Sequence, residues 1–229
     1  MSVLGELQPN KVFQYFEEIC AIPHGSRNLQ QISDYLVDFA KAHGLKYRQD
    51  EDLNVIIWKD GSKGYEDSDP VILQGHMDMV AVKESDCDKD MEKEGLDLEI
   101  DGDYILAKGT SLGGDDGIAV AYTLAVLDDE EMAHPPIEAI FTVNEEIGML
   151  GAATIDVSDL KGRLFMNMDS EDEGVFTVSC AGGASVICKI PYETETVNAS
   201  VIEIKMDGFT GGHSGVEIIK GRMNANCAM

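Results

Sequence analysis

The sequence predicts an α/β protein in which helices cover a β-sheet. Short runs of β-branched and apolar residues, each of strand length, alternate along the chain with segments whose apolar residues recur at helical spacing. Turns containing glycine or proline separate these segments, as is typical between strands and helices. With 229 residues, 44% of them hydrophobic, the chain is long enough to bury a sizeable core.

Two amphipathic helices are predicted first. One covers Asn10 to Cys20 and is stopped by Pro23, and the other runs from about Leu29 to His43, where Gly44 is its C-terminal stop. The β-branched stretch from Asn54 to Trp58 predicts a strand. The chain therefore begins with helices and reaches the sheet by about residue 54.

A buried strand is predicted to begin at Val71, after a polar, turn-rich loop from Gly61 to Pro70. The apolar residues run into Gly75, which allows another part of the chain to come close. The following stretch, Lys83 to Asp103, is dense in acidic residues and is interpreted as a solvated loop or an edge hairpin.

The second half continues the alternation. A glycine-rich acidic turn from Gly113 to Gly117 opens an apolar helix over about Ile118 to Leu127. Strands are predicted over Ile137 to Val143 and Arg163 to Met168.

A domain boundary is expected at Gly182–Gly183. We expect a catalytic domain over residues 1–183 and the beginning of a second domain over residues 184–229. In the second domain, strands are predicted over Ala184 to Ile190 and Val201 to Asp207, followed by a helix that starts near Val216.

Composition excludes several classes of partner. The formal net charge of −26 argues against nucleic acid and anionic membranes, which would repel so acidic a chain. No apolar run approaches the length of a bilayer span. The N-terminus lacks the basic start and apolar core of a signal peptide, so we expect a cytoplasmic protein with its five cysteines reduced.

Acidic residues collect where the predicted strands end. His76 and Asp78 stand two positions apart after the Val71 strand, so their side chains point to the same side if the segment is extended. The other acids in such positions are Glu145, Glu146 and Asp169, and Asp115 lies in the glycine-rich turn that opens a helix. The carboxyl ends of strands in an α/β sheet form the usual ligand site, so these side chains can converge on one pocket.

Each of these acids has a simpler explanation when taken alone. Asp115 can cap the helix beside it, Glu145 and Glu146 can be surface acids, and Asp169 can satisfy a turn. Their occurrence together, in order and at strand ends, favours a metal site instead. One imidazole with several carboxylates suits Zn²⁺, Mn²⁺ or Co²⁺.

Five motifs in order give the chain a resemblance to a known family. QGHMDMV, TSLGGDDGIA, NEEIGMLGA, NMDSE and GFTGGHSG resemble the aminoacyl-histidine dipeptidases, also called Xaa-His or cytosol non-specific dipeptidases. The resemblance runs through essentially all 229 residues. It implies a mixed sheet covered by helices, as in dinuclear zinc exopeptidases, followed by the start of an inserted α+β lid domain.

The resemblance also implies ligands for two divalent metal ions, most simply zinc, with manganese or cobalt as alternatives. His76 and Asp169 would bind the first ion and Glu146 the second, while Asp115 would bridge both. Asp78 would lie behind the histidine, fixing its tautomer and basicity.

The activity implied is hydrolysis of dipeptides, both Xaa-His and broader ones, by metal-activated water. Glu145 would act as general base, and His213, in the lid domain, would reach the substrate carbonyl. Asp116 would shape the bridging turn. The family's full-length members imply a homodimer and a small peptide as substrate.

One departure from the family concerns the second metal. In the family, a histidine from a segment near the C-terminus completes the second metal site, and it has no counterpart here. We therefore expect an N-terminal fragment with an incomplete second metal site. The sequence does not predict activity for this segment alone. Three alternatives stay open at this stage: a related metal-dependent tripeptidase, an N-acyl amino acid deacylase, and a non-catalytic metal-binding domain of the same fold.

Overall fold

The structure, a computed structural model, describes residues 2–170, 174–180, 182, 186–212 and 217–229. The chain divides into two compact units, Met1–Val178 and Ser179–Met229. The expected domain boundary at Gly182–Gly183 stays a prediction, because Gly183 lies outside the described residues.

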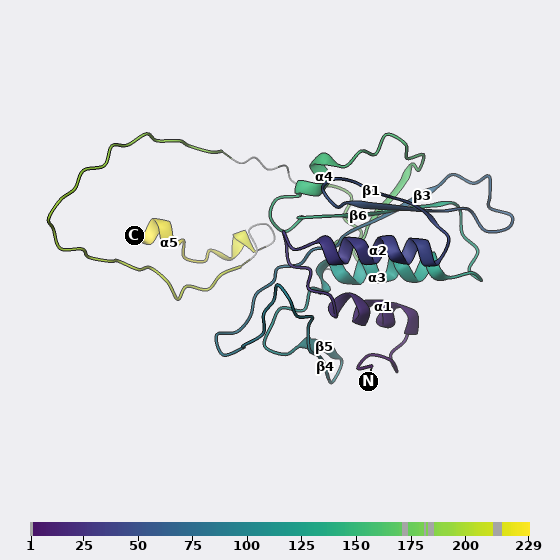
Figure 1. The fold of residues 1–229 in the computed structure, drawn as a ribbon, viewed down its shortest axis with the longest axis horizontal. Coiled ribbons are helices and arrows are strands. Elements are labelled where there is room, and N and C mark those ends of the chain that lie inside the picture. Colours follow the sequence, from purple (N-terminus) through teal and green to yellow (C-terminus); the bar gives the residue numbers. More distant parts are fainter. Residues whose placement is uncertain (1, 171–173, 181, 183–185, 213–216) are drawn as a thin grey trace. The chain divides into compact units, whose positions relative to one another are not determined.

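A mixed sheet organises the first unit, and its five strands lie in the order β1-β2-β6-β3-β7 (Figure 1). The strands are β1 (Lys46–Gln49), β2 (Val55–Lys59), β3 (Val71–His76), β6 (Ile137–Thr142) and β7 (Leu164–Asn167). β3 runs parallel to both β6 and β7, so these three strands end at the same edge of the sheet. β2 runs antiparallel to β6 and β1 to β2. The mixed sheet predicted from the sequence is confirmed.

Three helices lie on one side of this sheet, two of them against it and the third against its neighbouring helix, and a short helix lies on the other side (Figure 1). The three are α1 (Asn10–Cys20), α2 (Gln30–Ala42) and α3 (Gly114–Asp128), and the short helix is α4 (Leu150–Thr154). Strand β6 shows how alternate residues serve the two faces. Ala139 and Phe141 belong to the main core with the helices, whereas Ile140 joins Ile56 and Ile72 in a smaller cluster.

The predicted helices agree closely with the structure. The bounds of α1 match the prediction, and its buried residues Val12, Phe16 and Ile19 lie on one face. The bounds of α2 differ by one residue at each end. Both helices bury an apolar stripe in the main core, which is why helical spacing was a sufficient signal.

The sequence did not place four short elements of the first unit, although a hairpin was one of the two interpretations of the acidic stretch from Lys83 to Asp103. β1 is the polar segment KYRQ at one edge of the sheet, where no apolar alternation marks a strand. α4 has five residues, too few for a helical period to show. The acid-dense stretch ends in a hairpin of β4 (Leu98–Asp101) and β5 (Tyr104–Ala107), which forms its own two-stranded sheet.

The predicted strands of the second unit are wrong for its described residues. Residues 186–190 and 201–207 have no regular secondary structure, and Val201 is 94% exposed. A strand requires a hydrogen-bonded neighbour, and apolar, β-branched composition alone does not supply one. The expected helix start at Val216 lies outside the described residues, and beyond it are only a 3₁₀ turn (Ile218–Lys220) and α5 (Ala225–Ala228).

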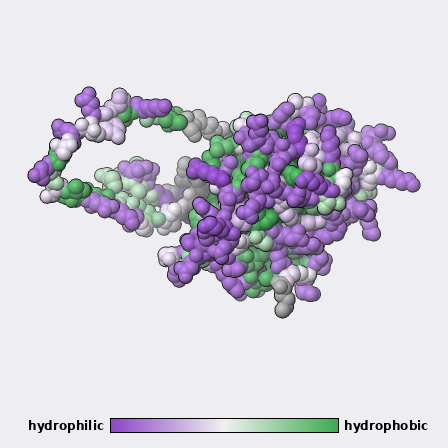
Figure 2. All heavy atoms as spheres, in the orientation of Figure 1, coloured by the Kyte–Doolittle hydropathy of each residue, from purple (hydrophilic) through white to green (hydrophobic). Residues whose placement is uncertain are grey.

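Among the described residues, no helix is both long and apolar enough to cross a bilayer. Hydrophilic side chains predominate on the face of the first unit that Figure 2 shows, with smaller apolar areas between them. This surface agrees with a chain of 43 acidic and 17 basic residues.

Candidate metal centre

His76 is the last residue of β3, and its side chain is 1% exposed. Its Nδ1 atom lies 2.9 Å from the backbone oxygen of Asp78. A carbonyl oxygen only accepts hydrogen bonds, so this contact assigns the ring proton to Nδ1. The other ring nitrogen, Nε2, lies 3.0 Å from Asp115 Oδ1 and 3.9 Å from Glu145 Oε2. The nitrogen that can bind a metal therefore faces the acids.

The Asp78 carboxylate is fully buried behind the imidazole. Oδ1 accepts the backbone N–H of Glu145 at 3.0 Å and lies 3.5 Å from His76 Nδ1, and Oδ2 accepts the Ser26 hydroxyl at 2.7 Å. Burial raises the pKa of the Asp78 carboxyl, but these hydrogen bonds outweigh burial and hold it below its usual value. Asp78 thus stays ionised and ties three segments together.

The start of α3 brings two acids to the end of β3. Gly113 has a left-handed backbone (φ 68°), and Asp115 and Asp116 are non-helical inside the helix bounds and joined by a cis peptide bond. Asp116 is buried, and its Oδ2 accepts the backbone N–H of His76 at 3.1 Å. This approach needs Gly75, where a Cβ atom would lie 2.8 Å from Asp116 Oδ2. The side chain of Asp115 is 56% exposed.

Glu145 and Glu146 lie on the tight loop that follows β6. The loop closes on itself, because Gly151 N–H donates to the Val143 oxygen at 2.9 Å. Asn144 takes a left-handed backbone (φ 54°), and its Oδ1 accepts the backbone N–H of Arg27 at 2.8 Å. These bonds fix the direction in which the loop presents its two adjacent acids.

Asp169 follows the end of β7. The backbone N–H of Met168 donates to the Gln74 oxygen at 3.1 Å, so pairing with β3 continues one residue beyond the strand. Asp169 is therefore placed next to the end of β3, where His76 lies.

The structure brings the candidate ligands into two overlapping triads. His76, Asp115 and Glu146 form one, and His76, Glu145 and Asp169 form the other, with the ligand atoms of each within 4.8 Å of one another. One imidazole and four carboxylates are a donor set that suits zinc, manganese or cobalt. The triads divide the acids differently from the roles implied by the resemblance, which therefore remain predictions.

The electrostatics of the centre follow from the crowding of like charges. Burial and the neighbouring carboxylates raise the pKa of Glu145 and of Glu146, against the opposing effect of His76. Burial raises the pKa of Asp116 to about 7. Burial lowers the pKa of His76, but hydrogen bonds to Asp115 and Asp78 and the nearby negative charges outweigh it and raise the value to about 11. A bound cation would relieve this excess of negative charge.

Of three residues that position the centre, two were not found from the sequence, whereas a close approach was expected at the third, Gly75. Ser26 contacts Asp78, Asn144 fixes the glutamate loop, and Gly75 admits Asp116. A lone serine in a loop carries no signal, whereas a glycine directly after a predicted strand was already a sign of close approach. His213, predicted to contact the substrate, lies outside the described residues.

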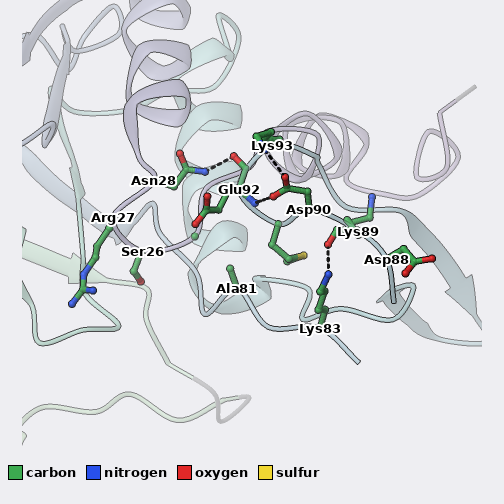
Figure 3. Close-up of a pocket in the computed structure, with 12 residues that line it drawn as sticks. Ser26, Arg27, Asn28, Ala81, Lys83, Asp88, Lys89, Asp90, Glu92 and Lys93 are labelled. Atoms are coloured by element: carbon green, nitrogen blue, oxygen red, sulfur yellow. Dashed lines mark hydrogen bonds and ion pairs between the residues drawn. The ribbon is translucent and has the colours of Figure 1, made fainter. Parts of the chain in front are cut away.

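A cavity of about 900 Å³ is lined by the Ser26 loop and by the stretch from Asp88 to Lys93 (Figure 3). None of the triad residues lines it. Two of its lysines are bonded to nearby groups: Lys93 pairs with Asp90 at 2.8 Å, and Lys83 Nζ donates to the Lys89 oxygen at 2.7 Å. The size of this cavity therefore does not make it the reaction site, and the triads remain the candidate centre.

Comparison with known proteins agrees with the motifs. No protein-family model matches the chain. The cytosol non-specific dipeptidase of Escherichia coli K12 is 40% identical over 228 residues, which are 99% of this chain and 47% of that protein. The resemblance to the aminoacyl-histidine dipeptidases is confirmed. The chain thus spans about half the length of this curated dipeptidase relative.

Solved structures support the same relationship. The aminoacylhistidine dipeptidase of Vibrio alginolyticus superposes with a TM-score of 0.73 at 42% identity, covering 75% of this chain and 35% of that one. A tripeptidase from Staphylococcus aureus superposes with a TM-score of 0.61 at 24% identity, covering 73% and 45% respectively. The tripeptidase shares the fold, and at this identity the likeness extends no further.

Proposed function

We propose that this chain carries the metal-binding part of a dipeptidase that hydrolyses Xaa-His and other dipeptides. The observation that carries the proposal is the pair of triads that share His76 at the ends of three parallel strands. The similarity to a curated dipeptidase over 99% of the chain supports it. Because the chain spans only 47% of that relative, the activity of the whole protein is part of the proposal.

The proposed metal ligands are His76, Asp115, Glu146 and Asp169, and we propose two divalent cations, zinc before manganese or cobalt. Bound there, the ions would supply a water of lowered pKa and polarise the peptide carbonyl. The donor chemistry fits, since Nε2 of His76 faces the carboxylates while Nδ1 is held by the Asp78 backbone oxygen. Asp78 orients the imidazole and does not itself bind metal in this proposal.

Glu145 is the proposed general base. It accepts a proton from the attacking water and returns it to the leaving amine, so that the C–N bond breaks and one acid and one amine are formed. Its Oε2 atom lies 3.9 Å from His76 Nε2, the proposed metal-binding atom, and this position supports the role. The contact of His213 with the substrate carbonyl oxygen remains a prediction for residues that the structure does not describe.

The location proposed for the protein is the cytoplasm. The Escherichia coli relative is named a cytosolic enzyme, and the described residues contain no helix that could cross a membrane.

The proposal is tested by two measurements, metal binding by this chain and hydrolysis by the longest natural form of the protein. We expect the chain to bind Zn²⁺ or Co²⁺, and His76→Ala to lower the affinity about a hundredfold or more because it removes the member that the triads share. Hydrolysis of Ala-His, a tripeptide and an N-acetyl amino acid is then compared in the longest natural form of the protein. Absence of metal binding, or faster cleavage of either of the other substrates, would overturn the dipeptidase assignment.

A further inference from the structure

Asn54, the residue before β2, is 1% exposed and lies against the glutamate loop. Its Oδ1 atom accepts the backbone N–H of Val143 at 3.1 Å, and its Nδ2 atom lies 3.4 Å from the Gly151 oxygen. Val143 directly follows β6, and its own oxygen accepts the backbone N–H of Gly151. One amide side chain, 89 positions from Val143 in sequence, thus meets the chain where the loop begins and where it returns.

The orientation of this amide is fixed by Asp50. Asp50 Oδ2 accepts from Asn54 Nδ2 at 2.8 Å, and Asp50 Oδ1 accepts the backbone N–H of Asn54 at 2.9 Å. An ionised carboxylate only accepts hydrogen bonds, so the NH₂ group faces Asp50 and the amide oxygen faces Val143. Asp50 therefore determines which end of the amide meets the loop.

The amide takes the place of a backbone partner where two strands part. β2 and β6 pair as far as Val55 and Phe141, and the backbone oxygen of Asn54 accepts an N–H of its own turn at 3.0 Å. Without the amide, the buried N–H of Val143 would lose its partner, and buried N–H groups are seldom left without one. The fit is close at Gly151, where a Cβ atom would overlap with Asn54 Oδ1.

We propose that Asn54 is a positioning residue for the metal centre, because its amide sets where the glutamate loop presents Glu145 and Glu146. The inference rests on the proposed dipeptidase function and adds to it a residue from the far side of β6. Val143 stands two positions before Glu145, so a shift of its N–H moves the proposed base and the proposed ligand together. An amide with a purely structural role would change stability alone, and the test separates the two.

The test exchanges the two polar side chains. In Asn54→Asp the carboxylate can still accept from Val143, but it faces the Asp50 carboxylate with no proton between them. We expect this variant to bind Co²⁺ about tenfold more weakly and to alter the visible absorption spectrum of the bound Co²⁺. Combining it with Asp50→Asn places an amide opposite the new carboxylate. That double variant should recover most of the affinity and the original spectrum.

Hydrolysis provides a second readout, in the longest natural form of the protein at saturating Zn²⁺. We expect Asn54→Asp to lower kcat for Ala-His by about tenfold to a hundredfold, because displacement of a catalytic group by about 1 Å has an effect of this size. KM should change little, since a side chain as buried as that of Asn54 does not reach the dipeptide.

The matched control is Glu138→Gln, near the other end of β6. Glu138 is also buried, and its carboxylate accepts the backbone N–H groups of Lys161 and Gly162 at 3.0 and 2.8 Å. It therefore holds a loop in the same way as Asn54 but away from the centre. The substitution should lower stability in urea and leave the Co²⁺ spectrum and kcat unchanged.

The outcomes separate the positioning role from the function. Lower stability of Asn54→Asp with unchanged Co²⁺ affinity, spectrum and kcat overturns the role, as do equal losses in Glu138→Gln. If Asn54→Asp does not fold, Asp50→Asn is measured alone, since it frees the amide to rotate and should alter the spectrum in the same direction. An unaltered spectrum there counts against the role. If the unchanged chain binds no Co²⁺, the proposed function fails and the positioning role falls with it.

Discussion

The Ser26 hydroxyl donates to Asp78 Oδ2 at 2.7 Å, across 52 positions of sequence. The other oxygen of this carboxylate accepts the backbone N–H of Glu145 and lies 3.5 Å from His76 Nδ1. One buried carboxylate therefore joins the Ser26 loop, the imidazole of His76 and the glutamate loop. Ser26 acts on the centre through Asp78, which makes it a positioning residue.

Removal of this hydroxyl should weaken metal binding. We expect Ser26→Ala to lower the Zn²⁺ affinity about tenfold, the lower end of the range for residues that support metal ligands. Ser26→Thr keeps a hydroxyl and should restore most of the affinity. Ser33→Ala is the matched control, because its buried hydroxyl donates to the Leu53 oxygen at 2.7 Å, away from the centre. Equal losses of affinity in Ser26→Ala and Ser33→Ala would contradict the positioning role.

The close approach at Gly75 predicts a cost for any side chain there. In Gly75→Ala the new Cβ would lie 2.8 Å from Asp116 Oδ2 and 2.9 Å from Ala119 Cβ. We expect the free energy of unfolding to fall by about 1–3 kcal/mol, as for other overpacked sites. Gly114→Ala, whose Cβ would meet only Leu112 Cδ2 at 3.9 Å, is the control. Urea denaturation measures both, and a Gly75→Ala chain as stable as Gly114→Ala would show that the contact is not tight.

The two glutamates should respond differently to the same substitution. Glu146→Gln removes a proposed ligand and should lower metal affinity about tenfold to a hundredfold. Glu145→Gln should leave metal affinity nearly unchanged but slow dipeptide hydrolysis by about a hundredfold or more in the longest natural form of the protein. Because Glu145 also belongs to a triad, the reverse pattern of metal affinities would assign it as the ligand and Glu146 as the base.

A pH-dependent contribution to stability is expected where α3 ends near α1. Asp128 Oδ2 pairs with Lys11 Nζ at 2.6 Å. Burial raises the pKa of the Asp128 carboxyl, but the bonds to Lys11 and Tyr15 outweigh burial and lower it below its usual value. A lowered pKa means that the ionised form stabilises the folded state. This contribution is fully present above the unfolded pKa of about 4 and is lost as pH falls through the folded value.

Asp128→Asn should therefore cost stability at neutral pH and little in acid. The Lys11 side chain is 51% exposed and that of Asp128 21%, so solvent screens the pair in part and we expect a loss of at most about 1 kcal/mol at pH 7. The difference from the unaltered chain should shrink below pH 4 in denaturation curves recorded at several pH values. Asp103→Asn, in the exposed β4–β5 turn, serves as the control. A difference that stays constant from pH 7 to pH 3 would contradict the assignment.

The sequence by itself determined the class of fold and the residues that meet at the centre. Helical spacing was sufficient for α1 and α2, because each buries an apolar stripe in the core. The acids were found because β3, β6 and β7 end at one edge of the sheet, and a residue that follows a strand is visible in the sequence.

Tertiary structure alone decided how those residues are arranged. The sharing of His76 between two triads, the Ser26 contact with Asp78 and the Asn54 contact with Val143 all depend on segments far apart in the chain. The strands predicted after residue 183 were wrong for the same reason. Strand propensity is a property of a local segment, whereas the neighbouring strand that must bond to it comes from another part of the chain. Sequence periodicity reports which face of a segment is buried, whereas the distances between side chains depend on how the segments pack.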